Sequence, residues 1–318
     1  KEIVDKHVHV AVEKGAKALL DRSGEDGAWT YQKGYPVGVT ALTVYTLLKC
    51  DIPVTHEAVA KGIDLILEKD PEGVYSAGLV ALALSSVIGK LQSTRETSDR
   101  LGRLRNRLQG TVDILVASQS KSGGWHYGVT LKKGGHTGNL DAYDFSNTQF
   151  AVLGLRAAAN GGARIPRKTW ENVLALYEKG GCKDGGWGYT GGGGSSEAMT
   201  AAGAYSWIIC QISLSEKLTE EKAAGSDRIK KAVDCLKKLY VVPDDPCSLY
   251  GLYSLERFCM TAKIEKLGDH DWYREGAVHL LRVQSGDGLW TGNYGEIVDS
   301  CFALLFLRRA TVSQVSEG

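Results

Sequence analysis

The sequence predicts an all-α protein: a single-domain α6/α6 toroid over residues 1–318, with six inner helices ringed by six outer helices. Glycine-rich clusters that contain a Trp recur along the chain, and each follows an amphipathic stretch and precedes an apolar one. Apolar residues three and four apart are typical of a helix with one buried face, whereas a helix that is apolar all round belongs inside a protein. The alternation therefore predicts outer and inner helices in turn.

Six amphipathic–apolar helix pairs are expected. In one of them, RLRNRLQGTVDILVASQ at 103–119 precedes TQFAVLGLRAAA at 148–159. Strands are excluded because period-two alternation is absent and the apolar runs are long for strands. The pairs are expected near residues 7–50, 54–88, 103–159, 166–212, 226–260 and 271–310, with loops at 89–102 and 129–143.

Composition narrows the classes of partner. The net charge is +1, from 38 basic and 37 acidic residues, so no positive field is available to attract nucleic acid. No apolar run approaches the ~20 residues of a transmembrane helix, so no membrane span is expected. The chain begins at Lys1 rather than Met, which suggests a processed product and leaves export open. The compartment itself is not specified by the sequence.

Two segments share the spacing Gln-x-x-x-Gly-x-Trp. They comprise Gln119, Gly123 and Trp125, and Gln284, Gly288 and Trp290. Two further clusters keep only the end of the pattern, before Trp29 and Trp187, with Ser23 and Gly181 in place of Gln.

This spacing resembles the QW motif of squalene–hopene and oxidosqualene cyclases. The apolar hairpins around it resemble the prenyltransferase and squalene oxidase repeats, including those of protein prenyltransferase β subunits, and the resemblance covers essentially the whole chain. It implies the terpenoid cyclase/protein prenyltransferase toroid, in which the Gln amide bonds backbone groups at a helix end and the Trp packs over it. Helix ends leave such backbone groups unpaired. An alternative is that the Trp and Tyr rings surround a carbocation.

The acid motif of class II terpene cyclases, DxDD, is absent. The single Asp pair, Asp244–Asp245, lies between prolines, as in a turn. The first expectation is therefore a squalene-cyclase-like binding or scaffold module. Two alternatives stay open: an isoprenoid-handling enzyme, either cyclase- or prenyltransferase-like, and a zinc-dependent transferase or carbohydrate-active α/α toroid enzyme.

Polar residues precede the expected inner helices, whose N-termini would converge at one mouth. Asp and Ser there are typical helix caps, but a carboxylate cluster at the mouth could also perform acid–base chemistry. The candidate catalytic residues are Asp144, Asp141 and Glu197, with Asp144 favoured because DAYDFSN is dense in polar groups.

Aromatic residues gather near the same helix starts. If some of them line a central pocket, they would suit an apolar, isoprenoid or sugar-like small molecule; another protein is the alternative partner. The candidate ligand-binding residues are Trp29, Tyr31, Trp125, Tyr127, Asn147, Trp187, Tyr189, Trp290 and Tyr294.

Asp299-x-Cys301 resembles the zinc-binding Asp-x-Cys of protein prenyltransferase β subunits. The resemblance implies zinc with a third ligand from a His elsewhere in the chain, because zinc needs at least three protein ligands. The alternative is that Cys301 is a small core residue. The available histidines are His126, His136, His270 and His279.

Overall fold

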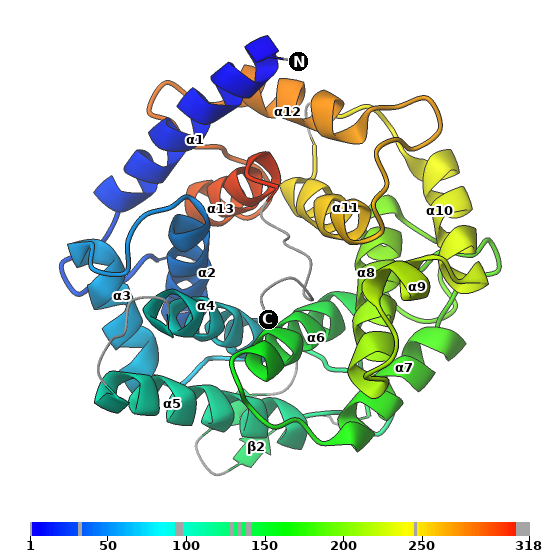
Figure 1. Ribbon diagram of the computed structural model, residues 1–318, viewed down its shortest axis with the longest axis horizontal. Helices are drawn as coiled ribbons and strands as arrows, with labels where there is room; N and C mark the ends of the chain where they lie inside the picture. Colours follow the sequence, from blue (N-terminus) through cyan, green and yellow to red (C-terminus); the bar gives the residue numbers. More distant parts are fainter. Residues whose placement is uncertain are drawn as a thin grey trace. The chain divides into compact units, whose positions relative to one another are not determined.

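The computed structural model describes residues 2–30, 34–92, 98–127, 130–132, 135–137, 141–244 and 247–309. These residues form helices and one short hairpin, labelled in Figure 1. The helices are α1 (Glu2–Asp21), α2 (Pro36–Lys49), α3 (Glu57–Glu68), α4 (Val74–Gln92), α5 (Ser98–Ala117), α6 (Phe145–Asn160), α7 (Arg167–Lys179), α8 (Glu197–Leu214), α9 (Glu220–Ala224), α10 (Asp227–Leu239), α11 (Leu249–Thr261), α12 (Trp272–Val283) and α13 (Glu296–Leu307). The hairpin joins β1 (Thr130–Lys132) to β2 (Gly135–Thr137), antiparallel.

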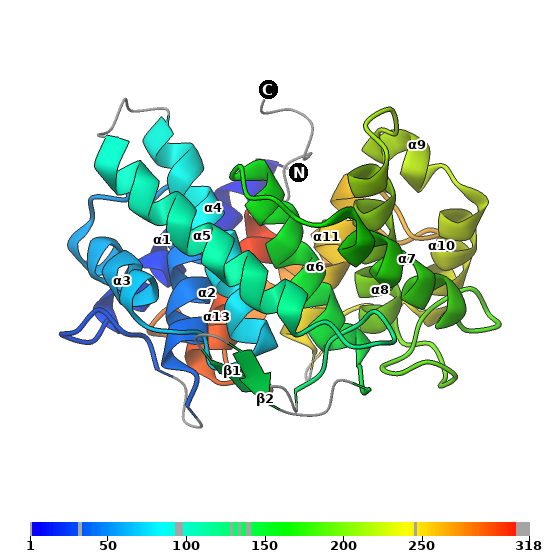
Figure 2. The ribbon, with the colours of Figure 1, turned by 90° about the horizontal axis from the view of Figure 1, so that it is seen from below.

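Twelve of the helices overlap the six expected ranges, although α1, α4, α5 and others extend beyond them, and α9 is an additional short helix between α8 and α10. The expected loop at 89–102 was wrong over the described residues. There α4 continues to Gln92 and α5 begins at Ser98, because Leu91 and Leu104 extend the apolar faces and are fully buried. The hairpin lies in the second expected loop, and Figure 2 shows it at the lower edge of the view.

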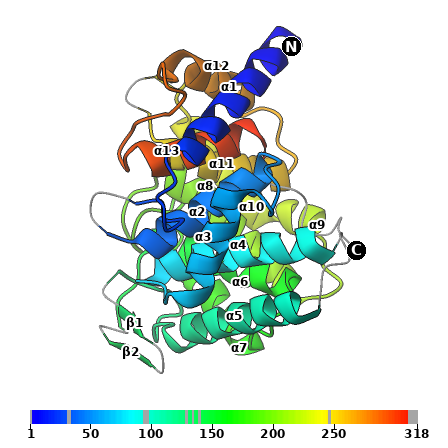
Figure 3. The same cartoon turned by 90° about the vertical axis from the view of Figure 1, so that its left-hand side faces the viewer.

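The chain divides into two compact units, residues 22–176 and residues 1–21 with 177–318. In the first unit, α4 packs between α2 and α6 (Figure 3). Small residues allow close approach: a Cβ on Gly78 would collide with the backbone at Phe150 of α6. Further along, the Ser85 hydroxyl donates to Ala157 O. The contacts advance together along both helices, so α4 and α6 run parallel.

In the second unit, α11 packs between α8 and α13, and all three helices are buried over most of their length. Arg257 of α11 reaches Tyr205 of α8, while Tyr250 and Tyr253 of α11 contact the ring of Phe302 in α13. The first helix of the chain, α1, packs against α12 and α13. Residues at opposite ends of the sequence therefore share one core.

Among the described residues, α4 is the one helix long and apolar enough to cross a membrane. Most of its side chains are buried in the protein, against α2, α5 and α6. A core helix of a globular protein meets the same criteria of length and composition, and burial on several sides is what its apolar sequence predicts.

Candidate functional site

The segment from Gln119 to Trp125 joins the end of α5 to its neighbours. The Gln119 side-chain amide donates to Gly123 O at 2.9 Å and to Thr169 O of α7 at 3.1 Å. The Trp125 indole N–H donates to Leu115 O at 2.8 Å. The indole thus satisfies a carbonyl in the last turn of α5, where a helix leaves acceptors unpaired, while the Gln119 amide ties this segment to the first turn of α7.

The segment from Gln284 to Trp290 repeats this arrangement in the other unit. The Gln284 amide donates to Gly288 O at 2.8 Å and to Ala11 O of α1 at 3.0 Å. The Trp290 indole donates to Leu280 O at 2.8 Å. Gly123 and Gly288 have φ values of 98° and 99°, a conformation that glycine adopts without strain.

The cluster at 183–194 lacks the Gln, and Arg228 of α10 takes its place. The guanidinium donates to Gly185 O at 2.6 Å, the carbonyl that corresponds to Gly123 O and Gly288 O, and lies 3.5 Å from the Trp187 ring centroid. A Cβ on Gly181 would lie 2.8 Å from Arg228 Nη2. Arg228 was not predicted from the sequence; the one signal for it was Gly181, which has no side chain at the position of the Gln.

The candidate ligand-binding tryptophans are enclosed. Trp29, Trp125 and Trp187 have no exposed surface, and Trp290 is 1% exposed, so none presents a ring face to solvent. The neighbouring tyrosines differ: Tyr127, Tyr189 and Tyr294 are 58%, 50% and 42% exposed. Tyr31 lies outside the described residues.

Asp144, the favoured catalytic candidate, is the N-cap of α6. Its carboxylate accepts hydrogen bonds from Ser146 Oγ at 2.7 Å, Asn147 N at 2.7 Å and Asn147 Nδ2 at 2.9 Å. Its backbone N–H donates to Trp125 O at 2.9 Å, which fixes the start of α6 against the Trp segment. Asp144 is 2% exposed, so its polar atoms face protein donors.

Hydrogen bonds link Asp144 to the surface of the same unit. Ser146 Oγ accepts from the Tyr75 hydroxyl at 2.7 Å, and Tyr75 accepts from the Tyr127 hydroxyl at 3.0 Å. The side-chain oxygen of Asn147 is buried and has no hydrogen-bond partner within the described part of the chain. Asp141, the second candidate, is instead exposed and pairs with Lys121 at 3.1 Å.

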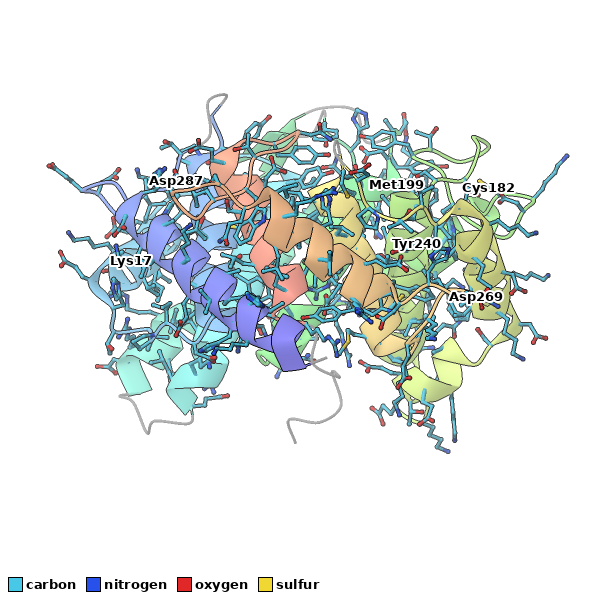
Figure 4. The ribbon with its side chains drawn as sticks, turned by 90° about the horizontal axis from the view of Figure 1, so that it is seen from above. Lys17, Cys182, Met199, Tyr240, Asp269 and Asp287 are labelled. Carbon is cyan, nitrogen blue, oxygen red and sulfur yellow. The ribbon has the colours of Figure 1, made fainter. Side chains whose placement is uncertain are left out.

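Glu197, the third candidate, begins α8 in the other unit. Burial raises its pKa to about 6, although the Val241 backbone N–H bonds the carboxylate and opposes the shift. Tyr240, labelled in Figure 4, precedes Val241 and donates to Glu275 Oε2 at 2.9 Å. Burial is also the first cause of the raised Tyr240 pKa, and the Glu197 charge adds to it. A carboxyl group that holds its proton near neutrality is suited to acid catalysis.

Replacing Glu197 with Gln should remove a pH dependence of stability. The pKa of Glu197 is raised from 4.5 to about 6 on folding, so the carboxyl group ionises more readily in the unfolded chain. The wild-type chain therefore loses stability as pH rises from about 4.5 to 6, and below this interval the group has no effect. The variant should be more stable by about 2 kcal/mol at pH 7.5 and equal to wild type at pH 4. Urea unfolding at both pH values measures this; an equal difference at both would contradict it.

The described residues around Asp299 do not assemble the ligands of a zinc site. Asp299 Oδ2 accepts from the backbone N–H groups of Gly292 and Tyr294 at 2.9 and 2.8 Å, and burial raises its pKa. Cys301 is fully buried. His270 bonds Glu275, and the side chain of His136 lies outside the described part. No three His, Cys, Asp or Glu side chains converge among the residues described, whereas zinc needs three.

The sequence matches no protein-family model and no curated protein. Among solved structures, a variant of the type II terpene cyclase MstE from Scytonema, in complex with its substrate geranylgeranyl dihydroxybenzoate, is similar at 13% identity and a TM-score of 0.62. The match covers 97% of this chain and 98% of that one. The α-1,6-mannanase GH76A from Salegentibacter sp. HEL1_6 is similar at 7% identity and a TM-score of 0.64, covering 95% and 98%.

The chain has the terpenoid-cyclase-like α/α toroid fold. At these identities the likeness establishes the toroid and not its chemistry, since one fold hosts many functions. The predicted fold class is therefore confirmed. The residues predicted from the sequence lie in both units. Asp144, Asn147 and Tyr127 belong to one hydrogen-bonded group in residues 22–176, whereas Glu197 and Asp299 lie in the other unit.

Proposed function

We propose that this toroid is a binding module for a small molecule and does not catalyse acid-initiated cyclisation. The hydrogen bonding of Asp144 supports this proposal most directly. A carboxylic acid that protonates an alkene needs a proton to give, yet both Asp144 oxygens accept hydrogen bonds from protein donors. An ionised carboxylate is an acceptor only, so this geometry favours capping over proton donation.

The structural neighbours support small-molecule binding as a use of the fold. The terpene cyclase was solved with geranylgeranyl dihydroxybenzoate and a mannanase variant with α-1,6-mannotriose. For this chain we place the ligand beside the Tyr127–Asp144 group, because polar groups at the start of a buried helix can orient a ligand. The absence of DxDD from the sequence agrees with binding without cyclisation.

Substitutions at Asp144 separate capping from catalysis. Asn is as good an N-cap as Asp, whereas Ala loses about 1 kcal/mol or more. We therefore expect Asp144→Asn to stay near wild-type stability and Asp144→Ala to lose about 2 kcal/mol, because buried donors on Ser146 and Asn147 also lose their acceptor. Urea unfolding of both variants is the measurement. Equal losses would contradict the capping role.

The proposed function is tested by binding and product analysis with the full chain. Geranylgeranyl dihydroxybenzoate and α-1,6-mannotriose are the probes, with calorimetry for binding and mass spectrometry for products. We expect binding of at least one probe and no product from either. A product that wild type forms and Asp144→Asn does not would overturn the proposal.

The raised pKa of Glu197 favours a second candidate, an isoprenoid- or carbohydrate-processing enzyme with Glu197 as its acid. The carboxyl group titrates near 6, where a general acid is effective. Turnover of either probe that is lost in a folded Glu197→Gln variant, and kept in Asp144→Asn, would establish this function in place of the first. The absence of turnover in wild type would eliminate it.

A further inference from the structure

We infer that Tyr127 and Asn147 form an acceptor-only site that selects a neutral, hydroxyl-bearing ligand such as a sugar or polyol. This inference rests on the proposed binding function and names the chemistry of its ligand. The site lies wholly within residues 22–176, where Tyr127 follows the Trp125 segment and Asn147 lies in the first turn of α6.

The direction of each hydrogen bond in the group is forced from its buried end. The Asp144 carboxylate can only accept, so Ser146 uses its one hydroxyl proton to donate to Asp144. Ser146 Oγ must then accept from the Tyr75 hydroxyl, whose single proton is used in this hydrogen bond. Tyr75 in turn accepts from Tyr127. Every hydroxyl proton in this series of hydrogen bonds therefore points toward Asp144.

The outermost hydroxyl consequently shows the solvent only lone pairs. Tyr127 is 58% exposed, and its proton is held by Tyr75 at 3.0 Å. A phenol that is normally both donor and acceptor is thereby restricted to accepting. A ligand at this position gains a hydrogen bond only if it brings a donor.

Asn147 adds a second acceptor beside the same carboxylate. Its Nδ2 donates to Asp144 Oδ2 at 2.9 Å, so Oδ1 is the amide atom that does not face this carboxylate. That oxygen is buried, in a side chain 1% exposed, and has no hydrogen-bond partner among the residues that the structure describes. A buried acceptor without a donor costs about 1–3 kcal/mol, a cost that a ligand hydroxyl or a bridging water would remove.

Aromatic rings supply an apolar surface next to these acceptors. The Tyr75 and Tyr127 ring centroids are 5.1 Å apart at 30°, and the buried ring of Phe150 on α6 supports Tyr75 from 4.7 Å. Such a surface suits the C–H face of a sugar ring while its hydroxyls donate to oxygen. Pockets for small ligands combine apolar walls with a few placed polar groups in this way.

The charge balance favours a neutral donor over a cation. The Asp144 charge lies at the N-terminus of α6, where the Asn147 backbone N–H and the helix dipole stabilise it. The two acceptors that remain for a ligand are a phenol and an amide, which carry no net charge. An anionic ligand would meet lone pairs without donors, so it is disfavoured.

The test compares one ligand with and without its donors. α-1,6-Mannotriose and its permethylated form share a shape, and only the first can donate hydrogen bonds. Calorimetry on the full chain should show at least tenfold tighter binding of mannotriose, and choline should bind more weakly than mannotriose. Equal binding of the two saccharides, no mannotriose binding, or tighter choline binding would each overturn the inference.

The Tyr75→Phe variant tests the relay, that is, the series of hydrogen bonds from Tyr127 through Tyr75 and Ser146 to Asp144. Without the Tyr75 oxygen, the Tyr127 proton is released and can point outward, so preference for mannotriose over the permethylated form should fall at least threefold. Tyr127→Phe should weaken mannotriose binding. Tyr35→Phe is the matched control, since Tyr35 is a 50% exposed tyrosine within residues 22–176 that makes no part of this group, and the selectivity of this variant should stay at the wild-type value. Unchanged selectivity in Tyr75→Phe would contradict the relay.

The same experiment separates the two proposals. If geranylgeranyl dihydroxybenzoate binds without turnover while mannotriose does not, the binding function stands and the acceptor-site inference fails. If either probe is converted to product and conversion is lost in Asp144→Asn, the binding function fails.

Discussion

Arg228→Ala should lower the free energy of unfolding by about 3 kcal/mol. The substitution removes a charge-assisted hydrogen bond to Gly185 O, worth about 1.5–3 kcal/mol. It also removes the guanidinium stacked 3.5 Å from the Trp187 ring, a contact worth about 0.5–2 kcal/mol. Because the two terms share one side chain, they are not strictly additive. Urea unfolding followed by tryptophan fluorescence measures the loss.

A compensating variant tests whether Arg228 replaces the missing Gln. Gly181→Gln alone should destabilise, since a Cβ there lies 2.8 Å from Arg228 Nη2. In the Arg228→Ala background it should instead recover about 1 kcal/mol, by donating to Gly185 O as Gln119 and Gln284 donate to the corresponding carbonyls. Lys230→Ala, which removes an exposed ion pair on the same helix, should change stability by less than about 0.5 kcal/mol. Additive effects of the Gly181 and Arg228 substitutions would refute the replacement.

Trp290→Ala should cost about 4 kcal/mol, the upper range for a buried aromatic residue. Its ring is 1% exposed, and its indole bonds Leu280 O. Gly15 of α1 lies against the ring, since a Cβ there would be 2.8 Å from Trp290 Cζ3. Amide hydrogen exchange should therefore show α1 losing protection before α8 and α11.

A conservative surface change on a neighbouring helix provides the control. Val278→Ser on α12 alters a side chain that is 49% exposed and should leave both stability and α1 protection near wild type. If Trp290→Ala unfolds the chain without selective exchange in α1, the Trp does not hold that helix in particular. We expect Gly15→Val to reduce the protection of α1, because the added side chain crowds the Trp290 ring. Unchanged protection of α1 in this variant would contradict the role of the Trp.

The candidate site was only partly visible in the sequence. Asp144, Asn147 and Tyr127 were all expected at helix starts, since their residue types and positions are local features. Tyr75 was missed as a member of the group, because its link to Ser146 spans 71 positions and nothing in either segment announces the other. For the Trp rings, the motif left open whether they pack in the core or bind a ligand. The structure shows that these rings are buried, so little of their surface is available to a ligand.

The sequence alone determined the alternation of amphipathic and apolar helices, and with it the fold class, because the spacing of apolar residues records which faces of a helix are buried. Only the tertiary structure decided which side chains meet between helices. Arg228 reaches a carbonyl 43 positions away, and hydrogen bonds connect Tyr127 to Asp144 through Tyr75 of α4 and Ser146 of α6. Such pairings depend on the register between helices and on the close approach that small residues permit. The spacing of apolar residues along a single helix specifies neither of them.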